Sequence, residues 1–128
     1  MKLPVPPGFI ITTDSFVEFV KEGSILCSDV RGTIEKAVHH IESEHHVSFG
    51  ATSLKSSPLL FSVRCGSSVL MPGITKTILN VGMNDAAVKG LTELSSNAIF
   101  PLNAFIAYLE SYGTILLIPH ACFAIFLI

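Results

Sequence analysis

The chain has 128 residues, with eight basic and ten acidic side chains and a formal net charge of −2. These charges are dispersed along the sequence without the basic stripe that nucleic-acid binding requires, so we predict no nucleic-acid partner. Charged residues make up 14% of the sequence, against about a quarter in typical domains, and the mean hydropathy is +0.60. We therefore expect some apolar surface to need a covering partner.

Cysteine usage and the two ends of the chain bear on its cellular setting. Cys27, Cys65 and Cys122 are odd in number and widely spaced, which argues against a disulfide framework or a zinc site. The first residues contain prolines where a secretory signal needs an apolar helix. The apolar run at 115–128 is shorter than the roughly 20 residues that span a bilayer. We predict reduced thiols, a cytoplasmic location and no membrane span.

A short strand at 9–11 and a helix are predicted near the amino terminus. Ser15 and Glu18 have the spacing of a capping box, and Gly23 is a suitable stop, which together predict a helix over about 14–22. This helix should pack beside the strand.

A second, longer helix is predicted over about 29–46, because apolar residues recur there at helical spacing. It carries a histidine cluster, and His40 and Glu44 lie four residues apart on one face. Metal binding is one interpretation, but the spacing matches no familiar site. A solvated polar face with one histidine at its apolar border is the simpler interpretation, and we assign no metal ligand. The apolar stripe is Ile34, Val38, Ile41 and His45, and the other candidate ligands are His39, His46 and Glu42.

The run at 58–63 is short, apolar and rich in strand-forming residues, which predicts a buried strand with Arg64 at its exit. The planar guanidinium of arginine suits phosphate oxygens, and nearby glycines let backbone amides approach an anion. Ordinary turns use the same residues, so this pattern alone leaves a merely solvated arginine open. The candidate anion-binding residues are Arg64, Gly66, Ser67, Ser68 and Gly73.

Two further helices are predicted in the last third of the chain. Asn84 can cap a helix that ends at about Leu94, and Pro101 can open another that runs to Tyr112 before Gly113. The alternation of strand and helix signals indicates an α/β layer. We find no repeat and no convincing internal linker, so residues 1–128 form one unit. The buried stripe of the last helix is expected to be Phe105, Leu109 and Tyr112.

Short segments along nearly the whole chain resemble, in order, the amino-terminal domain of pyruvate, phosphate dikinase. The most specific is Met71-Pro72-Gly73 followed by Thr-Ile-Leu-Asn-Val-Gly-Met-Asn at 77–84. Related phosphoenolpyruvate synthases look similar around the arginine but usually lack this element. The segments are residues 3–9, 11–13, 62–64, 71–73, 77–85 and 118–120.

This resemblance implies a partial ATP-grasp nucleotide-binding domain. Such a domain uses ATP and Mg²⁺ to pass the β-phosphate to a histidine on a separate swivelling domain, ahead of phosphoenolpyruvate formation elsewhere. It also implies that Arg64 contacts ATP, that the other domains of a dikinase are partners, and that a full-length protein can be a homo-oligomer. The family's ATP-binding lysine segment, and the second half of its ATP-grasp domain, have no counterpart in 1–128. We predict that the isolated chain is inactive, because phosphoryl transfer needs several groups and metal ions together.

The chain departs from the family pattern at several positions. Lys76 stands where an aspartate is usual, and Ile106-Ala107 where a paired arginine is usual. Residues 124–128 read as a divergent tail. Cys65 replaces a serine, and is either a small packed side chain or a thiol activated by Arg64. Two alternatives therefore stay open: a truncated non-catalytic copy that acts at most as an interaction module, and a piece of a phosphoenolpyruvate synthase-like phosphotransferase.

Overall fold

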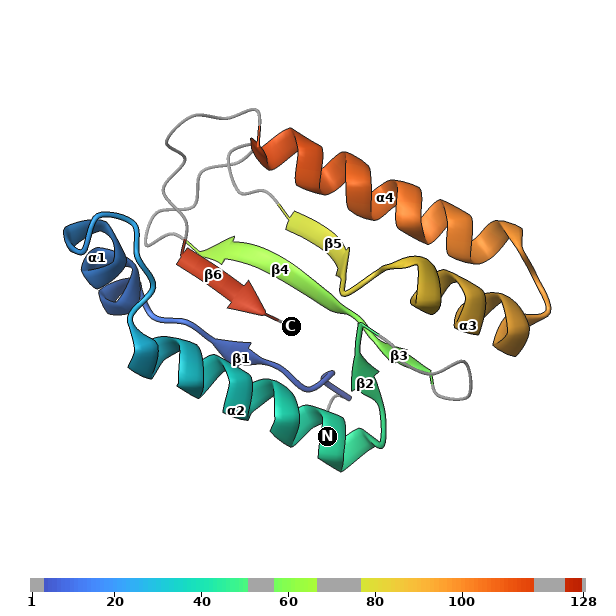
Figure 1. Cartoon of the computed structure of the whole chain (residues 1–128), viewed down its shortest axis with the longest axis horizontal. Helices are drawn as coiled ribbons and strands as arrows, with labels where there is room; N and C mark the ends of the chain where they lie inside the picture. The colour runs from blue at the N-terminus through green and yellow to red at the C-terminus, as the bar shows by residue number, and fades with distance from the viewer. Residues whose placement is uncertain (1–3, 51–56, 67–76, 117–123, 128) are drawn as a thin grey trace.

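The computed structural model describes residues 4–50, 57–66, 77–116 and 124–127, and these form a mixed α/β fold. At its centre lies a four-stranded antiparallel sheet with the order β1-β6-β4-β5 (Figure 1). Two short strands, β2 (Ser48–Phe49) and β3 (Pro58–Leu59), form a separate parallel pair. The predicted α/β class is confirmed. The strands of the main sheet are β1 (Phe9–Ile10), β4 (Phe61–Gly66), β5 (Thr77–Val81) and β6 (Ala124–Leu127).

The described helices flank this sheet. Figure 1 shows α1 (Thr13–Lys21) and α2 (Ser28–His45) next to the β1 end of the sheet, and α3 (Asp85–Ser95) and α4 (Ile99–Leu116) next to its β5 end. Helix α4 runs beside β5, where the backbone N–H of Leu79 donates to the hydroxyl of Ser111 at 3.1 Å. This bond occupies a backbone donor of the β5 edge, so α4 protects that edge from pairing with another strand.

Helix α1 agrees with the prediction to within one residue at each end, but its start differs in detail. The helix begins at Thr13, and Thr12 is the N-cap without a side-chain capping bond. Ser15 therefore lies inside the first turn, and the expected capping box with Glu18 is wrong. Its end is as predicted, because Gly23 adopts a φ of +68°, which a glycine tolerates best.

Helix α4 begins two residues earlier than predicted. The Asn97 side-chain oxygen accepts from the backbone N–H groups of Ile99 at 2.9 Å and Phe100 at 3.3 Å. Asparagine is a preferred capping residue, and Pro101 then falls in the first turn, where its missing N–H is harmless. The helix continues through Gly113 to Leu116.

The predicted buried stripe of α4 is partly wrong. Leu109 is 51% exposed and Tyr112 is 42% exposed. Phe105 is partly buried as expected, and Tyr108 and the fully buried Pro101 lie on the same covered side. Since α4 carries apolar residues on opposite faces, its periodicity alone does not indicate which face packs against α3 and β5.

Strand β4 also differs from the prediction. It continues from Phe61 to Gly66, so Arg64 lies within the strand and not at its exit. An antiparallel sheet with one face open accommodates a charged side chain in a strand, which the prediction did not consider. Residues 124–127 form β6 between β1 and β4, with Phe126 the Cα partner of both Ile10 and Arg64. That 124–128 diverge from the family in sequence stays a prediction.

Two apolar clusters hold the fold. One lies between α3 and α4 around Met83 and Ala87, and the other joins Phe61 to Phe9 and Phe49, with ring centroids 6.1 and 5.4 Å apart respectively. None of the helices in the described part of the chain combines the length and apolarity needed to cross a membrane. The side chains that pack around the first cluster are Leu60, Val88, Leu91, Ala104, Phe105 and Tyr108.

Candidate functional site

Arg64 lies on β4, an inner strand of the main sheet. Its Cα partners are Thr77 of β5 and Phe126 of β6, so antiparallel pairing fixes its backbone on both sides. Because side chains alternate between the two faces of a strand, Arg64 shares one face with Ser62 and Gly66. Arg64 is exposed on that face, which leaves its guanidinium available to a ligand.

The surroundings of Arg64 suit an anion. Within the described ranges no carboxylate forms an ion pair with Arg64. Its cross-strand neighbour is Thr77, which is half-buried and adds a hydroxyl donor on the same face. Gly66 ends the strand without a side chain. A planar cation beside hydroxyl donors is an arrangement that binds phosphate or carboxylate oxygens.

The structure therefore places only part of the predicted site. Arg64 and Gly66 lie two residues apart on one face of β4, whereas Ser67, Ser68, Gly73 and Lys76 fall outside the described residues. Thr77 was not predicted. The available signal was a hydroxyl at the start of a β-rich run, but its position opposite Arg64 depends on strand register, which a single sequence does not display.

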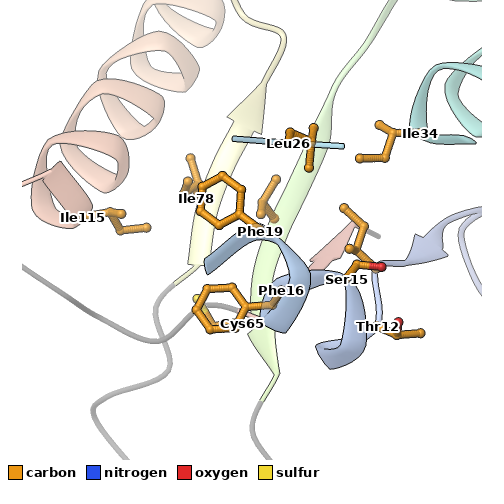
Figure 2. A pocket seen from close by; sticks show the side chains of 11 residues that line it. Thr12, Ser15, Phe16, Phe19, Leu26, Ile34, Cys65, Ile78 and Ile115 are labelled. Carbon is orange, nitrogen blue, oxygen red and sulfur yellow. The ribbon is translucent and has the colours of Figure 1, made fainter. Parts of the chain in front are cut away.

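A cavity of about 430 Å³ lies on the other face of the sheet (Figure 2). Phe16 and Phe19 line it from α1, and Val63 and Cys65 line it from β4. No charged side chain is among its described lining residues, which also include Ile78. Since a polyphosphate would lose its hydration there without gaining a cation, this cavity is an apolar space and does not suit an anion.

Cys65 belongs to this apolar face. It is half-buried and lines the cavity, while strand alternation directs it to the opposite face from Arg64. The structure thus favours the packing interpretation of Cys65 over a thiol activated by Arg64.

Residues 77–85, which include most of the family-like element noted in the sequence, fix the backbone of β5 next to Arg64. The β4–β5 register shifts between the pairs Phe61–Val81 and Val63–Ile78, so β5 contains one extra residue. Asn80 has a φ of +55° in this irregularity, and its side-chain amide donates to the carbonyl of Ala104 at 2.9 Å. Asparagine tolerates this left-handed conformation better than most residues, and the bond ties β5 to α4.

The end of the same segment ties α3 to the β2 region. Gly82 has a φ of +103°, and a Cβ at this position would lie 2.7 Å from the Phe49 ring. Asn84 is the N-cap of α3, since its Oδ1 accepts from the backbone N–H of Ala87 at 2.8 Å, and its Nδ2 donates to the carbonyl of Gly50. The predicted Asn84 cap is confirmed, and Asn80, Gly82 and Asn84 all have structural roles.

The histidine cluster of α2 is built around Glu42. One carboxylate oxygen of Glu42 accepts from the backbone N–H of Phe49 at 2.7 Å, and the other lies 2.7 Å from Nδ1 of His39. The bond from Phe49 is the main cause of a lowered Glu42 pKa; partial desolvation opposes it, and His39 adds to it. Glu42 therefore ties α2 to β2.

The remaining members of the α2 cluster are more open. His40 Nε2 and Glu44 Oε2 are 3.8 Å apart on the exposed surface, and His45, expected at the apolar border, is exposed. Among the residues that the structure describes, no group of three or more histidine, cysteine or acidic side chains is placed to hold a metal ion.

Comparison with known proteins relates this mixed α/β fold to one family. No protein-family model matches the chain. Pyruvate, phosphate dikinase of Rickettsia typhi is 40% identical over 124 residues, which is 96% of this chain. The dikinase of Clostridium symbiosum is 32% identical and the chloroplastic dikinase of Flaveria trinervia is 35% identical, each over 122 residues and 94% of this chain.

These relatives establish what the chain corresponds to. It is a mixed α/β polypeptide with an arginine on an open sheet face. It is homologous to a segment of pyruvate, phosphate dikinase, as the resemblance of the motifs indicated. The chain spans 14% of the Rickettsia and Clostridium relatives and 12% of the Flaveria relative.

Proposed function

We propose that this chain is part of the ATP-grasp nucleotide-binding domain of a dikinase, and that Arg64 is its contact with the phosphates of ATP. The observation that carries the proposal is that the Arg64 side chain is exposed while pairing with two neighbouring strands fixes its backbone. Within the described ranges no carboxylate neutralises it. Homology to proteins named pyruvate, phosphate dikinase supports ATP as the anion.

The chemistry of the face fits a phosphate group. The guanidinium of Arg64 donates two parallel hydrogen bonds to phosphate oxygens, and the hydroxyl of Thr77 is a further donor on the same face. Gly66 leaves room for an anion to approach the backbone. These groups bind and orient a phosphate, and none of them transfers it.

Magnesium does not fit the residues described around Arg64. The ion prefers carboxylate and other oxygen ligands in octahedral geometry, whereas this face offers a cation and hydroxyl groups. We therefore assign Mg²⁺ to groups outside this face and derive no step through it.

Catalysis requires groups beyond this face. Phosphoryl transfer depends on neutralising several developing charges at once, and one guanidinium is insufficient. We propose that the isolated chain binds ATP without turnover, and that transfer of the β-phosphate to a histidine needs the remaining dikinase domains. A cytoplasmic location belongs to the same proposal.

Calorimetric titration of the chain with magnesium-ATP tests the role of Arg64. Replacing Arg64 with alanine removes charge-assisted bonds of about 1.5–3 kcal/mol, which weakens binding roughly ten- to a hundredfold. Arg31, exposed on α2, is the matched control, and Arg31→Ala should leave the Kd within about twofold. Equal affinity of the wild-type and Arg64→Ala chains, or the absence of ATP binding by the wild type, would contradict the proposal.

A further inference from the structure

The apolar cavity on the face of β4 opposite Arg64 has the size of a small-molecule site. Its volume is about 430 Å³. Ligand pockets hold about 300–1,000 Å³, and a cavity of about 150 Å³ already holds benzene. Residues of α1, α2, β4, β5 and α4 line it, so segments far apart in the sequence surround one space (Figure 2). The cavity therefore has room for one or two fused rings.

The walls of the cavity do not suit water. An enclosed water needs about two to four polar partners, whereas apolar walls such as Ile34 and Val63 offer none. The polar side chains among the described lining residues are Thr12, Ser15 and Cys65. An apolar occupant removes these walls from water and is therefore favoured over solvent.

Helix α1 gains burial from such an occupant. None of the residues of α1 is buried, and Phe16 and Phe19 are only half-buried where they line the cavity. Their ring centroids are 6.5 Å apart, with the ring planes inclined by 31°. Aromatic rings attract one another at centroid separations of about 4.5–7 Å. Two phenyl rings in the wall therefore favour an aromatic ring over an aliphatic chain.

The cavity and the Arg64 face do not hold the same ATP molecule. Val63 and Cys65 line the cavity, and strand alternation places Arg64, between them, on the other face of β4. A nucleotide bound at Arg64 would have to cross the sheet to place its base in the cavity. Adenine also carries several nitrogen atoms that need polar partners, which the cavity offers in small number. The ligand of the cavity is therefore a separate molecule.

We propose that this cavity binds an uncharged aromatic molecule of one or two fused rings, for which indole is the model. The hydroxyl of Thr12 or Ser15 accepts the one N–H or O–H that such a molecule carries. The described lining residues include no charged side chain, so the site selects against ions. The site goes beyond the ATP-binding proposal and does not depend on it.

The fluorescence of indole reports its entry into the cavity. The chain contains no tryptophan, so indole emission has no background from that side chain. Transfer from water to the cavity should shift the emission to shorter wavelength, and the titration should saturate at one indole per chain with a Kd below about 1 mM. Indole-3-acetate has the same ring with a carboxylate and should bind at least about tenfold more weakly. Adenosine should not displace indole.

Filling the cavity tests its location. Val63→Phe adds a ring from the β4 wall and should raise the Kd for indole at least about tenfold. Leu79→Phe is the matched control, because Leu79 follows Ile78 on β5 but is 40% exposed and not among the lining residues. It should leave the Kd within about twofold. Far-UV circular dichroism checks that each variant keeps its helices. If Val63→Phe does not fold, Cys65→Leu adds less bulk to the same wall and should raise the Kd at least about threefold.

The contrary outcomes are distinct. A folded wild type that shows no saturable shift of indole emission up to about 1 mM overturns the proposal. Binding that the filling variants at Val63 and Cys65 leave unchanged, or that Leu79→Phe weakens as strongly, overturns the location. Displacement of indole by adenosine would assign the cavity to a nucleotide base and overturn its separation from the ATP face.

Discussion

Replacing Gly82 with alanine tests the frame that positions β5 and α3. Gly82 has a φ of +103°, and an added Cβ would lie 2.7 Å from Cε2 of Phe49 and 3.1 Å from the backbone oxygen of Leu59. The Phe49 ring can rotate away, but the Leu59 carbonyl belongs to β3 and can move only with that strand. The ring of Phe49 also packs against Phe61, with centroids 5.4 Å apart.

The expected loss of stability follows from these contacts. A left-handed backbone costs a residue other than glycine about 1–2 kcal/mol. Displacing Phe49 from Phe61 loses about 0.5–1.5 kcal/mol of aromatic contact. Alanine recovers about 0.4–1 kcal/mol by restricting the unfolded chain. The net expectation is a destabilisation of about 2 kcal/mol.

Urea unfolding followed by far-UV circular dichroism measures this change. Gly32→Ala is the matched control, because Gly32 lies within α2 and an added Cβ has no neighbour within 4 Å. That control should raise the free energy of unfolding by about 0.5–1 kcal/mol. If Gly82→Ala is as stable as the wild type, the close approach of Gly82 to Phe49 and Leu59 is not a constraint on the fold.

Two further substitutions test the bonds at β2. Asn84→Ala removes the α3 cap and the bond to Gly50, which should lower the free energy of unfolding by about 1–2 kcal/mol in the same assay; an unchanged midpoint would contradict the capping role. The Glu42 pKa is lowered in the folded state, so the stabilisation by its ionised carboxylate is present above the ordinary value of 4.5 and is lost as the pH falls through the folded pKa. Glu42→Gln should therefore destabilise the chain at neutral pH, and solvent screening limits the loss to about 1 kcal/mol. The difference in stability between this variant and the wild type should shrink in acid, because Glu42 is then protonated in the wild type. If Glu42→Gln and the wild type show the same pH profile of stability, the tie between Glu42 and Phe49 is refuted.

Helix ends were predictable where local signals fix them. Asn84 caps α3 with its own side chain, and Gly23 ends α1 in a left-handed conformation, and both effects involve only nearby residues. The predicted start of α4 was wrong, because Asn97 caps a helix that begins at Ile99, two residues before Pro101. Two adjacent capping signals compete there, and the residues involved do not indicate which prevails.

Long-range features were not predictable in the same way. The pairing of 124–127 with β1 and β4 joins segments far apart in the chain, and no local pattern indicates it. The candidate site shows the same limit. The chemistry of Arg64 follows from its residue type, but its place within β4 and its neighbour Thr77 depend on register. The covered face of α4 likewise depends on what packs against it.

The most direct test of the proposed contact between Arg64 and the phosphates of ATP is to observe the Arg64 guanidinium during titration with magnesium-ATP. Arg31 and Arg64 are the two arginines of the chain, so their side-chain Nε–H signals can be assigned in a ¹H–¹⁵N spectrum with one variant each. We predict that the Arg64 signal shifts and saturates with ATP and with inorganic triphosphate but not with adenosine, while the Arg31 signal stays in place. An Arg64 signal that does not move, or that moves no more than that of Arg31, would contradict a phosphate contact at this face of the sheet.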